Sequence, residues 1–414
     1  MKTLLIVISG IALLFLATLA CQGEPEGDQP LKIGQIIPDT GGLSPFGGSH
    51  KNAANLAVKQ VLGAGGQTVI LTQEDNQTNS EVGNEVLQKL VDVDKVIAVV
   101  GSLSGTFTTP STPNKSTMLG GQISTVSSYS GLTIFEDHTV SEMTENKFLF
   151  LTTVFGGAQG MVLARLAKEL GYKSAAMMYL NNSYGRGMSY AFKRTFEANG
   201  GKIVGFSTYK ADKTSFTSEL TNAVVGKPDV MMVIGYPEHA KIYLREVQES
   251  GYTGKFLFTD TSRSSNLFEA VGWEYFEGMY GTAPGFEDTE ARRIFSTDYE
   301  AEFSEPAVDP FMAETYDSVV LIALASAKAG TTTDSAKIRS SLVEVSSQPG
   351  EVVGPGVDGI RRAFDLIKSG QDIEYLGASG SELEKNRIDN VISPVEIWQI
   401  KGGKIVPTGR LEFP

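Results

Sequence analysis

Hydroxyl-rich loops are the segments of this sequence best suited to bind a small polar molecule. Ser104 and Thr106 follow a continuous apolar run at residues 96–100, and the segment STVSSYS at residues 124–130 follows residues 118–123. If these runs are strands, the hydroxyl groups lie beyond strand carboxyl ends, where open α/β sheets bind their ligands. Helix N-termini often lie beside such loops and favour anions. The alternative is ordinary helix capping and turn chemistry.

No catalytic motif accompanies these loops. The sequence contains no GxxxxGK[ST] segment, and Gly185-Arg-Gly187 is followed by Tyr190 where a dinucleotide fingerprint needs its third glycine. Leu103 stands where a nucleophile elbow needs serine. The 3 histidines are far apart, which disfavours a Ser-His-Asp site and a histidine metal site. The sequence therefore favours no catalytic motif and predicts no metal or cofactor, while a pair of catalytic carboxylates stays open.

Composition and charge exclude several other classes of protein. The chain has 414 residues, of which 41% are hydrophobic and 20% are charged, so we expect a globular protein of two or three domains. The net charge of -13 argues against a nucleic-acid surface, because such a surface needs a basic patch to neutralise phosphates. The single cysteine excludes an intrachain disulfide and a cysteine-based zinc site.

Strands and helices are predicted to alternate along two stretches of the chain. In the first stretch, strands at residues 31–37, 69–72 and 96–100 alternate with helices at 52–62 and 82–90. In the second stretch, helices at 159–170, 184–199, 215–225 and 239–250 alternate with strands at 174–179, 203–207, 229–234 and 256–258. This alternation predicts two doubly wound α/β units with parallel sheets. Residues 349–359 and 370–390 are predicted to be later loops or insertions.

The first 20 residues are predicted to be a secretory signal peptide. Lys2 is followed by an apolar run at residues 4–20, which ends at Cys21. A cysteine directly after such a run indicates a bacterial lipoprotein that is acylated at Cys21, although the preceding residues, Thr-Leu-Ala, depart from the lipoprotein pattern. Ordinary cleavage before Cys21 and an uncleaved membrane anchor are the alternatives. Residues 21–30 contain Gly, Pro and acids without an apolar run, so we expect a flexible tether.

Five longer segments carry a resemblance to a known family. They read LKIGQIIPDTGGLSPFGGSHKNAANLAV, VVGSLSG, YLNNSYGRGMSYAFKRTFEANGGKIV, DVMMVIGYPEHAKIYLREVQESGYTGKFLF and VEIWQIKGGKIV. With these segments, the sequence from residue 31 to residue 404 resembles the type 1 periplasmic binding proteins, in the leucine/isoleucine/valine-binding branch that serves ABC transporters. The resemblance implies an α/β fold of two Rossmann-like doubly wound lobes, joined by three crossovers, with the ligand cleft between them. Lobe one would comprise residues 31–151 and 284–376, and lobe two residues 152–283 and 377–414.

The resemblance also implies that the protein is not an enzyme and that it has a ligand shell at eight positions. These are Phe46, Ser104, Gly105, Thr106, Ser128, Tyr184, Tyr236 and Asp260. The three aromatic residues would wall the pocket, the 104–106 loop and Ser128 would hold a carboxylate, and Asp260 would pair with an α-ammonium group. Gly105 stands where the family usually has serine, and residues 125–127 read TVS where the family usually has a Pro-Ala pair. The alternatives are core packing for Phe46 and Tyr236 and helix capping for Asp260.

Together these features predict an exported substrate-binding lipoprotein. It would be a monomer at the periplasmic or cell-surface face of a bacterial membrane, where it captures an amino acid or a related small polar molecule by hinge closure and delivers it to an ABC permease. The departures at residues 105 and 125–127 leave open an amide, a urea-type compound or an aromatic carboxylate as the ligand. A sensory ligand-binding receptor is another alternative, and an exported enzyme on the same scaffold is a third.

Overall fold

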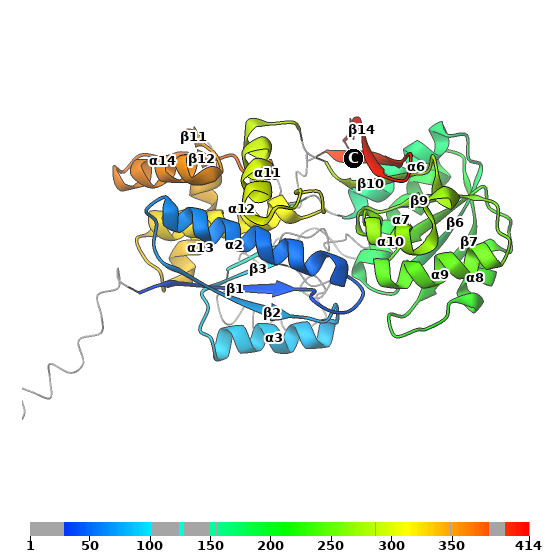
Figure 1. Cartoon of the computed structure of the whole chain (residues 1–414), viewed down its shortest axis with the longest axis horizontal. Coiled ribbons are helices and arrows are strands. Elements are labelled where there is room, and N and C mark those ends of the chain that lie inside the picture. The colour runs from blue at the N-terminus through cyan, green and yellow to red at the C-terminus, as the bar shows by residue number, and fades with distance from the viewer. Residues whose placement is uncertain are drawn as a thin grey trace, which may run out of the picture.

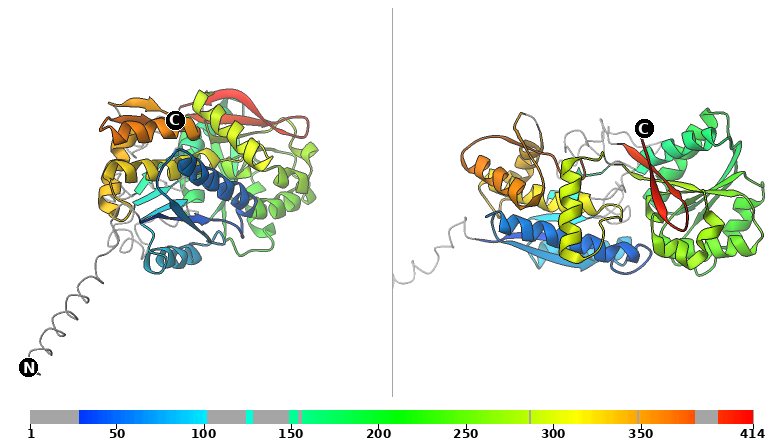
Figure 2. Two further views of the ribbon diagram at one scale, coloured as in Figure 1. Left: turned by 60° about the vertical axis from the view of Figure 1, so that its left-hand side comes forward. Right: turned by 45° about the horizontal axis from the view of Figure 1, so that its top comes forward.

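The structure is a computed structural model with two α/β units that lie side by side (Figure 1). It describes residues 29–101, 124–127, 149–153, 156–285, 287–347, 349–380 and 394–413. Figure 2 shows from two further directions that the blue, yellow and orange segments form one unit and the green and red segments form the other. The predicted α/β class with two lobes is thereby confirmed.

The first unit is built on a parallel sheet of five strands in the order β2-β1-β3-β4-β5. The strands are β1 (Leu31–Ile37), β2 (Val69–Asp75), β3 (Ala98–Gly101), β4 (Ser124–Ser127) and β5 (Leu149–Leu151). Helices cover both faces of this sheet, because β1 alternates its apolar side chains between them. Ile33 packs in the core that contains α2 (Gly47–Gly63), whereas Ile36 packs against Leu87 and Leu90 of α3 (Ser80–Asp92).

The second unit has a mixed sheet of seven strands in the order β14-β13-β10-β9-β8-β6-β7. Its parallel strands are β6 (Ser174–Leu180), β7 (Lys202–Tyr209), β8 (Val230–Ile234), β9 (Lys255–Phe258) and β10 (Tyr280–Pro284). The antiparallel pair β13 (Val395–Ile400) and β14 (Ile405–Glu412) completes it next to β10. The helices of this unit are α6 (Gly156–Glu169), α7 (Ser183–Ala198), α8 (Thr217–Val224), α9 (Pro237–Glu249) and α10 (Ser265–Val271).

The chain returns to the first unit after β10 and adds a second group of helices there. These are α11 (Glu290–Phe303), α12 (Met312–Ala329), α13 (Ser335–Ser346) and α14 (Gly356–Lys368), together with the short strands β11 (Glu351–Val353) and β12 (Ile373–Tyr375). Helix α12 is central, since every residue from 312 to 326 is buried. Its apolar run from residue 319 to residue 325 leaves no polar face in that stretch, which is expected only for a helix inside a core.

The chain therefore passes between the units three times, after β5, after β10 and after β12. The third connection is held to α12 by Asp317, whose buried carboxylate accepts hydrogen bonds from Tyr375 Oη (2.9 Å) and from the N–H groups of Ala378 (3.1 Å) and Ser379 (2.7 Å). A Cβ atom at Gly377 would lie 2.2 Å from Asp317 Oδ2, so only glycine fits there. The precise lobe boundaries given above stay a prediction.

Three loop predictions were wrong. Residues 124–127 form β4 in the middle of the first sheet, where they pair with β3 and β5, although their serine and threonine content had suggested a loop. β11 and the start of α14 lie within residues 349–359, and β12 lies within residues 370–390. β11 and β12 pair with each other, and such a pairing between distant short segments leaves no periodic signal in the sequence.

No helix within the described ranges is long and apolar enough to cross a membrane.

Candidate ligand-binding site

Asp260 lies at the centre of a buried polar cluster in the second unit. It follows β9 and begins the short 3-10 helix η3 (Asp260–Ser262), so its side chain lies beyond the carboxyl end of a strand. Its carboxylate is inaccessible to solvent and accepts hydrogen bonds from Tyr184 Oη (2.5 Å), Gln159 Nε2 (2.7 Å) and Thr261 N (2.8 Å). These donors fix the position of the carboxylate in the fold.

The cluster extends through Gln159 to the connections between the units. Gln159 lies on α6, which follows the first connection, and its Oε1 accepts a hydrogen bond from Thr282 Oγ1 (3.2 Å) on β10, which precedes the second connection. Asp260 is thereby linked to two of the three points where the chain changes unit. No sequence signal points to Gln159, because its partner Asp260 lies 101 residues away along the chain.

Two tyrosines lie next to Asp260. The rings of Tyr184 and Tyr236 stack with centroids 6.1 Å apart, and both side chains are buried. Burial and the neighbouring Asp260 carboxylate raise the pKa of Tyr184 well above its usual value, so its hydroxyl stays protonated and remains a donor. Asn182 caps α7 by accepting from Gly185 N (2.8 Å) and donates to Tyr236 Oη (2.8 Å). The NNSYG segment thus orients both aromatic rings.

The first unit reaches this region through the loop between β1 and α2. Leu43 and Phe46 belong to the hydrophobic core of the second unit, the same cluster that contains Tyr184 and Tyr236. Gly42 lies against Tyr236, because a Cβ atom at residue 42 would be only 2.9 Å from Tyr236 Cδ2. The structure therefore brings together four of the predicted site residues, and Phe46 contributes from the opposite unit.

The remaining predicted site residues lie outside the described residues. They are Ser104, Gly105, Thr106, Ser128 and Cys21. The strands that lead to the two loops are described: β3 ends at Gly101 and β4 ends at Ser127, side by side in the first sheet. The assignment of these loops to carboxylate binding stays a prediction.

Two of the cavities lined by described residues lie near the boundary of the units or the connections between them. One of about 850 Å³ lies between the units and is lined by Arg263, Trp273 and Glu396 of the second unit and by Arg292 and Asp309 of the first. Arg263 Nη1 forms an ion pair with Glu396 Oε2 at 2.9 Å on its wall. Phe46, Tyr184, Tyr236 and Asp260 are not among its lining residues.

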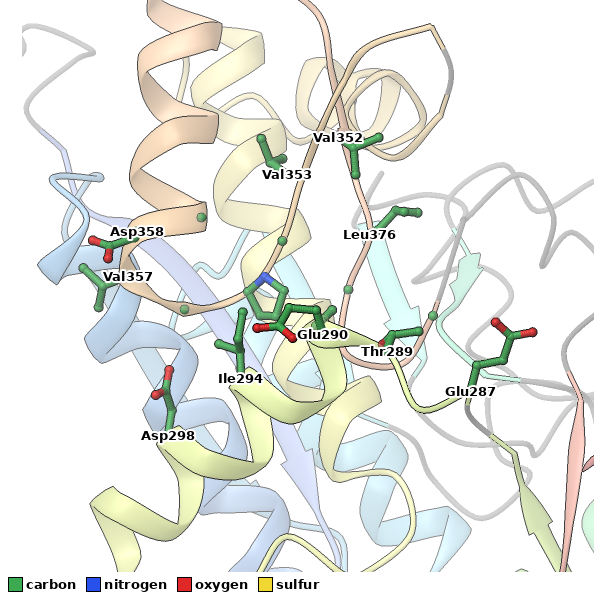
Figure 3. Close-up of a pocket in the computed structure, with 17 residues that line it drawn as sticks. Glu287, Thr289, Glu290, Ile294, Asp298, Val352, Val353, Val357, Asp358 and Leu376 are labelled. Atoms are coloured by element: carbon green, nitrogen blue, oxygen red, sulfur yellow. The ribbon is translucent and has the colours of Figure 1, made fainter. Parts of the chain in front are cut away.

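The other cavity, of about 830 Å³, is shown in Figure 3. It lies between α11, the turn that leads into α14, and the third connection, with Ile294, Val353 and Leu376 on its walls. No strand or helix of the second unit contributes to it, so movement of the two units would not enclose a ligand there. Within the described ranges, no group of His, Cys, Asp or Glu side chains could hold a metal ion.

Comparison with known proteins gives consistent results. The family described as "Periplasmic binding protein" matches residues 30–364 of the chain. A leucine-, isoleucine-, valine-, threonine- and alanine-binding protein of Pseudomonas aeruginosa is 24% identical over 307 residues, which is 72% of this chain and 79% of that protein. The substrate-binding protein BasB of a chemotactic signal transduction system in Halobacterium salinarum is 22% identical over 365 residues, which is 85% of this chain and 83% of that protein.

Solved structures share the fold. The crystal structure of a leucine-binding protein, LivK, from Thermotoga maritima superposes with a TM-score of 0.72 and 20% sequence identity. The superposition covers 93% of this chain and 99% of that one.

Proposed function

The chain belongs to the periplasmic binding protein family, and on that premise we propose that it captures an amino acid or a related small polar molecule between its two units and delivers it to an ABC permease. A member of this family is an exported binding protein and not an enzyme. The observation that carries the proposal is the buried Asp260 carboxylate, which lies at a strand end beside Tyr184 and Tyr236 and is tied to two interunit connections.

The chemistry of an amino acid fits this arrangement. Its ammonium group needs an acceptor or an anion, which Asp260 supplies. Its carboxylate needs donors, and we assign these to the loops at residues 104–106 and to Ser128 in the first unit. Since neither charge tolerates burial without a partner, the ligand is fully satisfied only when the two units close on it. Phe46, Tyr184 and Tyr236 would exclude water from the closed site.

A ligand screen tests this proposal directly. The chain without residues 1–20 is heated with amino acids, amides, urea-type compounds and aromatic acids, and the unfolding temperature is recorded. A ligand present at 100 times its Kd stabilises the native state by about 2.7 kcal/mol, which is readily detected. We expect amino acids to give the largest shifts, accompanied by a smaller radius of gyration in solution scattering. Shifts confined to uncharged compounds or aromatic acids would favour those ligands instead.

Sensing is the second candidate function. The relative in Halobacterium salinarum is named for a chemotactic signal transduction system, so the same fold serves a receptor in that case. Both functions use the same ligand site and differ in the membrane partner. Copurification of the liganded protein with a permease from native membranes supports transport, whereas copurification with a transducer protein supports sensing.

We also propose that Cys21 carries a lipid that holds the protein at a membrane surface. The cysteine directly follows the apolar run of the signal peptide, and the acidic segment that follows would serve as a tether. Cys21→Ala is expected to move the protein from the membrane fraction to the soluble exported fraction. Gln22→Ala is the matched control and should remain with the membrane. Equal solubility of the wild type and Cys21→Ala would refute the anchor.

A further inference from the structure

Glu314 is a buried acid next to the interunit region that the site described so far does not use. It lies in the first turn of α12 and has no solvent exposure. Its backbone carbonyl accepts hydrogen bonds from Ser318 Oγ (2.6 Å) and from Thr152 Oγ1 (3.2 Å), and Thr152 lies in the first connection between the units. The backbone of Glu314 is therefore fixed where the chain leaves the first unit.

The side chain of Glu314 lacks the partners that its backbone has. Neither carboxyl oxygen has a hydrogen-bond partner among the residues that the structure describes. Asp317, one turn further along the same helix, accepts three hydrogen bonds and is fully accounted for as an anchor of the third connection. A buried polar group without partners is costly and rare in native proteins, and functional sites are where such groups are found.

The surroundings of Glu314 indicate which kind of ligand group it faces. Burial raises the pKa of Glu314 to about 8, the nearby Arg292 on α11 opposes this, and the negative charges of Asp317 and of Asp260 across the interunit region add to it. A cationic group that reaches the buried Glu314 carboxyl would supply the partner that its two oxygens lack, whereas an anion would be repelled.

We infer that Glu314 is a second ligand-binding carboxylate, contributed by the first unit, and that it selects ligands with a second cationic nitrogen besides the α-ammonium group. This inference rests on the proposed function. Asp260 would hold the ammonium group that all amino acids share, and Glu314 would distinguish a diamino acid from an aliphatic one. An empty site leaves Glu314 protonated near neutral pH, and a cationic ligand displaces that proton.

Matched pairs of ligands test the inference. The diamino acids 2,3-diaminopropionate, 2,4-diaminobutyrate, ornithine and lysine are titrated into the wild type, Glu314→Gln and Glu344→Gln. The Kd of each diamino acid is compared with the Kd of the alkyl amino acid of equal length. In the wild type, at least one diamino acid should bind tenfold or more tightly than its alkyl counterpart. Glu314→Gln should reduce that preference to less than about threefold. Glu344→Gln removes an exposed acid from the same unit and should keep it.

Two further measurements keep the test independent of how well Glu314→Gln folds. Glu314→Asp retains the charge and should shift the preference to the diamino acid that is one methylene longer. Calorimetry of the wild type at pH 7 in phosphate and in Tris should show release of close to one proton when the preferred diamino acid binds, and none with its alkyl counterpart.

The outcomes separate this inference from the proposed function. Diamino acids that bind no more tightly than their alkyl counterparts in the wild type would overturn the role of Glu314, and so would a preference that survives in Glu314→Gln. In either case, tight binding of the alkyl series would leave the amino-acid function intact. Failure of the wild type to bind any amino acid would overturn both.

Discussion

Asp260→Asn is expected to weaken the binding of every amino-acid ligand by roughly 30- to 4,000-fold. The ammonium group of the ligand would lose a buried charged partner, which costs about 2–5 kcal/mol, and each 1.4 kcal/mol corresponds to about tenfold in Kd. Titration calorimetry of the wild type and the variant with the best ligand of the screen measures this directly. Unlike Glu314→Gln, this variant should affect aliphatic amino acids and diamino acids alike.

The hydrogen bonds around Asp260 allow asparagine to fold in its place. The Asn oxygen can accept from Tyr184 and from Thr261 N, as Asp260 Oδ1 does now. The new amide N–H would face Gln159 Nε2, but rotation of the Gln159 amide by 180° presents its oxygen instead, and its N–H then donates to Thr282 Oγ1. We therefore expect binding to change far more than stability, which separates charge from shape.

Asp212→Asn is the matched control for this experiment. Asp212 is an exposed acid on the second unit, away from the cluster, and its replacement should leave the Kd unchanged. A change of less than about threefold in Asp260→Asn would show that Asp260 serves only to hold Tyr184 and Gln159 in place. The ligand would then be one without a cationic group, such as an amide or an aromatic carboxylate.

His50 is expected to make the native state about 3 kcal/mol less stable at pH 4 than at neutral pH. This side chain of α2 is buried, and its Nε2 lies 2.8 Å from Pro310 O, to which it donates as a neutral imidazole. Burial lowers the pKa of His50 from 6.5 to about 4, and the bond to Pro310 only partly opposes this. The unfolded chain therefore binds more protons between pH 6.5 and 4, and each pKa unit corresponds to about 1.4 kcal/mol.

Urea unfolding at pH 7.5 and pH 4.0 measures this contribution. From pH 7.5 to pH 4.0, the free energy of unfolding should fall further in the wild type than in His50→Gln, by about 3 kcal/mol. Glutamine keeps a hydrogen-bond donor at residue 50 but does not titrate. Glu314 acts in the opposite sense, since a raised carboxyl pKa lowers stability as the pH rises from 4.5 through 8, but this effect is common to both proteins. Parallel losses in both proteins would show that His50 does not titrate in this range.

The strands that the sequence predicted well are those buried on both faces of a sheet. LKIGQII at residues 31–37 is β1 with the predicted bounds, and the runs at 174–179 and 256–258 differ from β6 and β9 by one residue. Each is a short apolar run bounded by turn residues, which is a local signal. β4 carries no such signal, because its Ser-Thr-Val-Ser sequence owes its place in the sheet to pairing with β3 and β5.

Only individual residues of the site could be predicted from the sequence, and they were predicted from the family resemblance. Phe46, Tyr184, Tyr236 and Asp260 were placed in one region, and the structure does bring them together. Asp260 is held rigidly by its hydrogen bond with Gln159. This contact depends on how α6 packs against η3, so the sequence of either segment alone does not predict it. Glu314 does carry a sequence signal, because an acid one turn before the apolar run at residues 319–325 is expected to be buried, but Asp317 carries the same signal.

Leu43 and Phe46 affect the heat capacity of the protein when the two units separate. In the structure these side chains of the first unit are packed in the core of the second, so separation of the units would bring them into contact with water. Hydration of apolar surface raises the heat capacity of the opened form. Capture of even a wholly polar ligand is therefore accompanied by a negative change in heat capacity, whose size reports the apolar surface that the protein itself buries rather than the nature of the ligand.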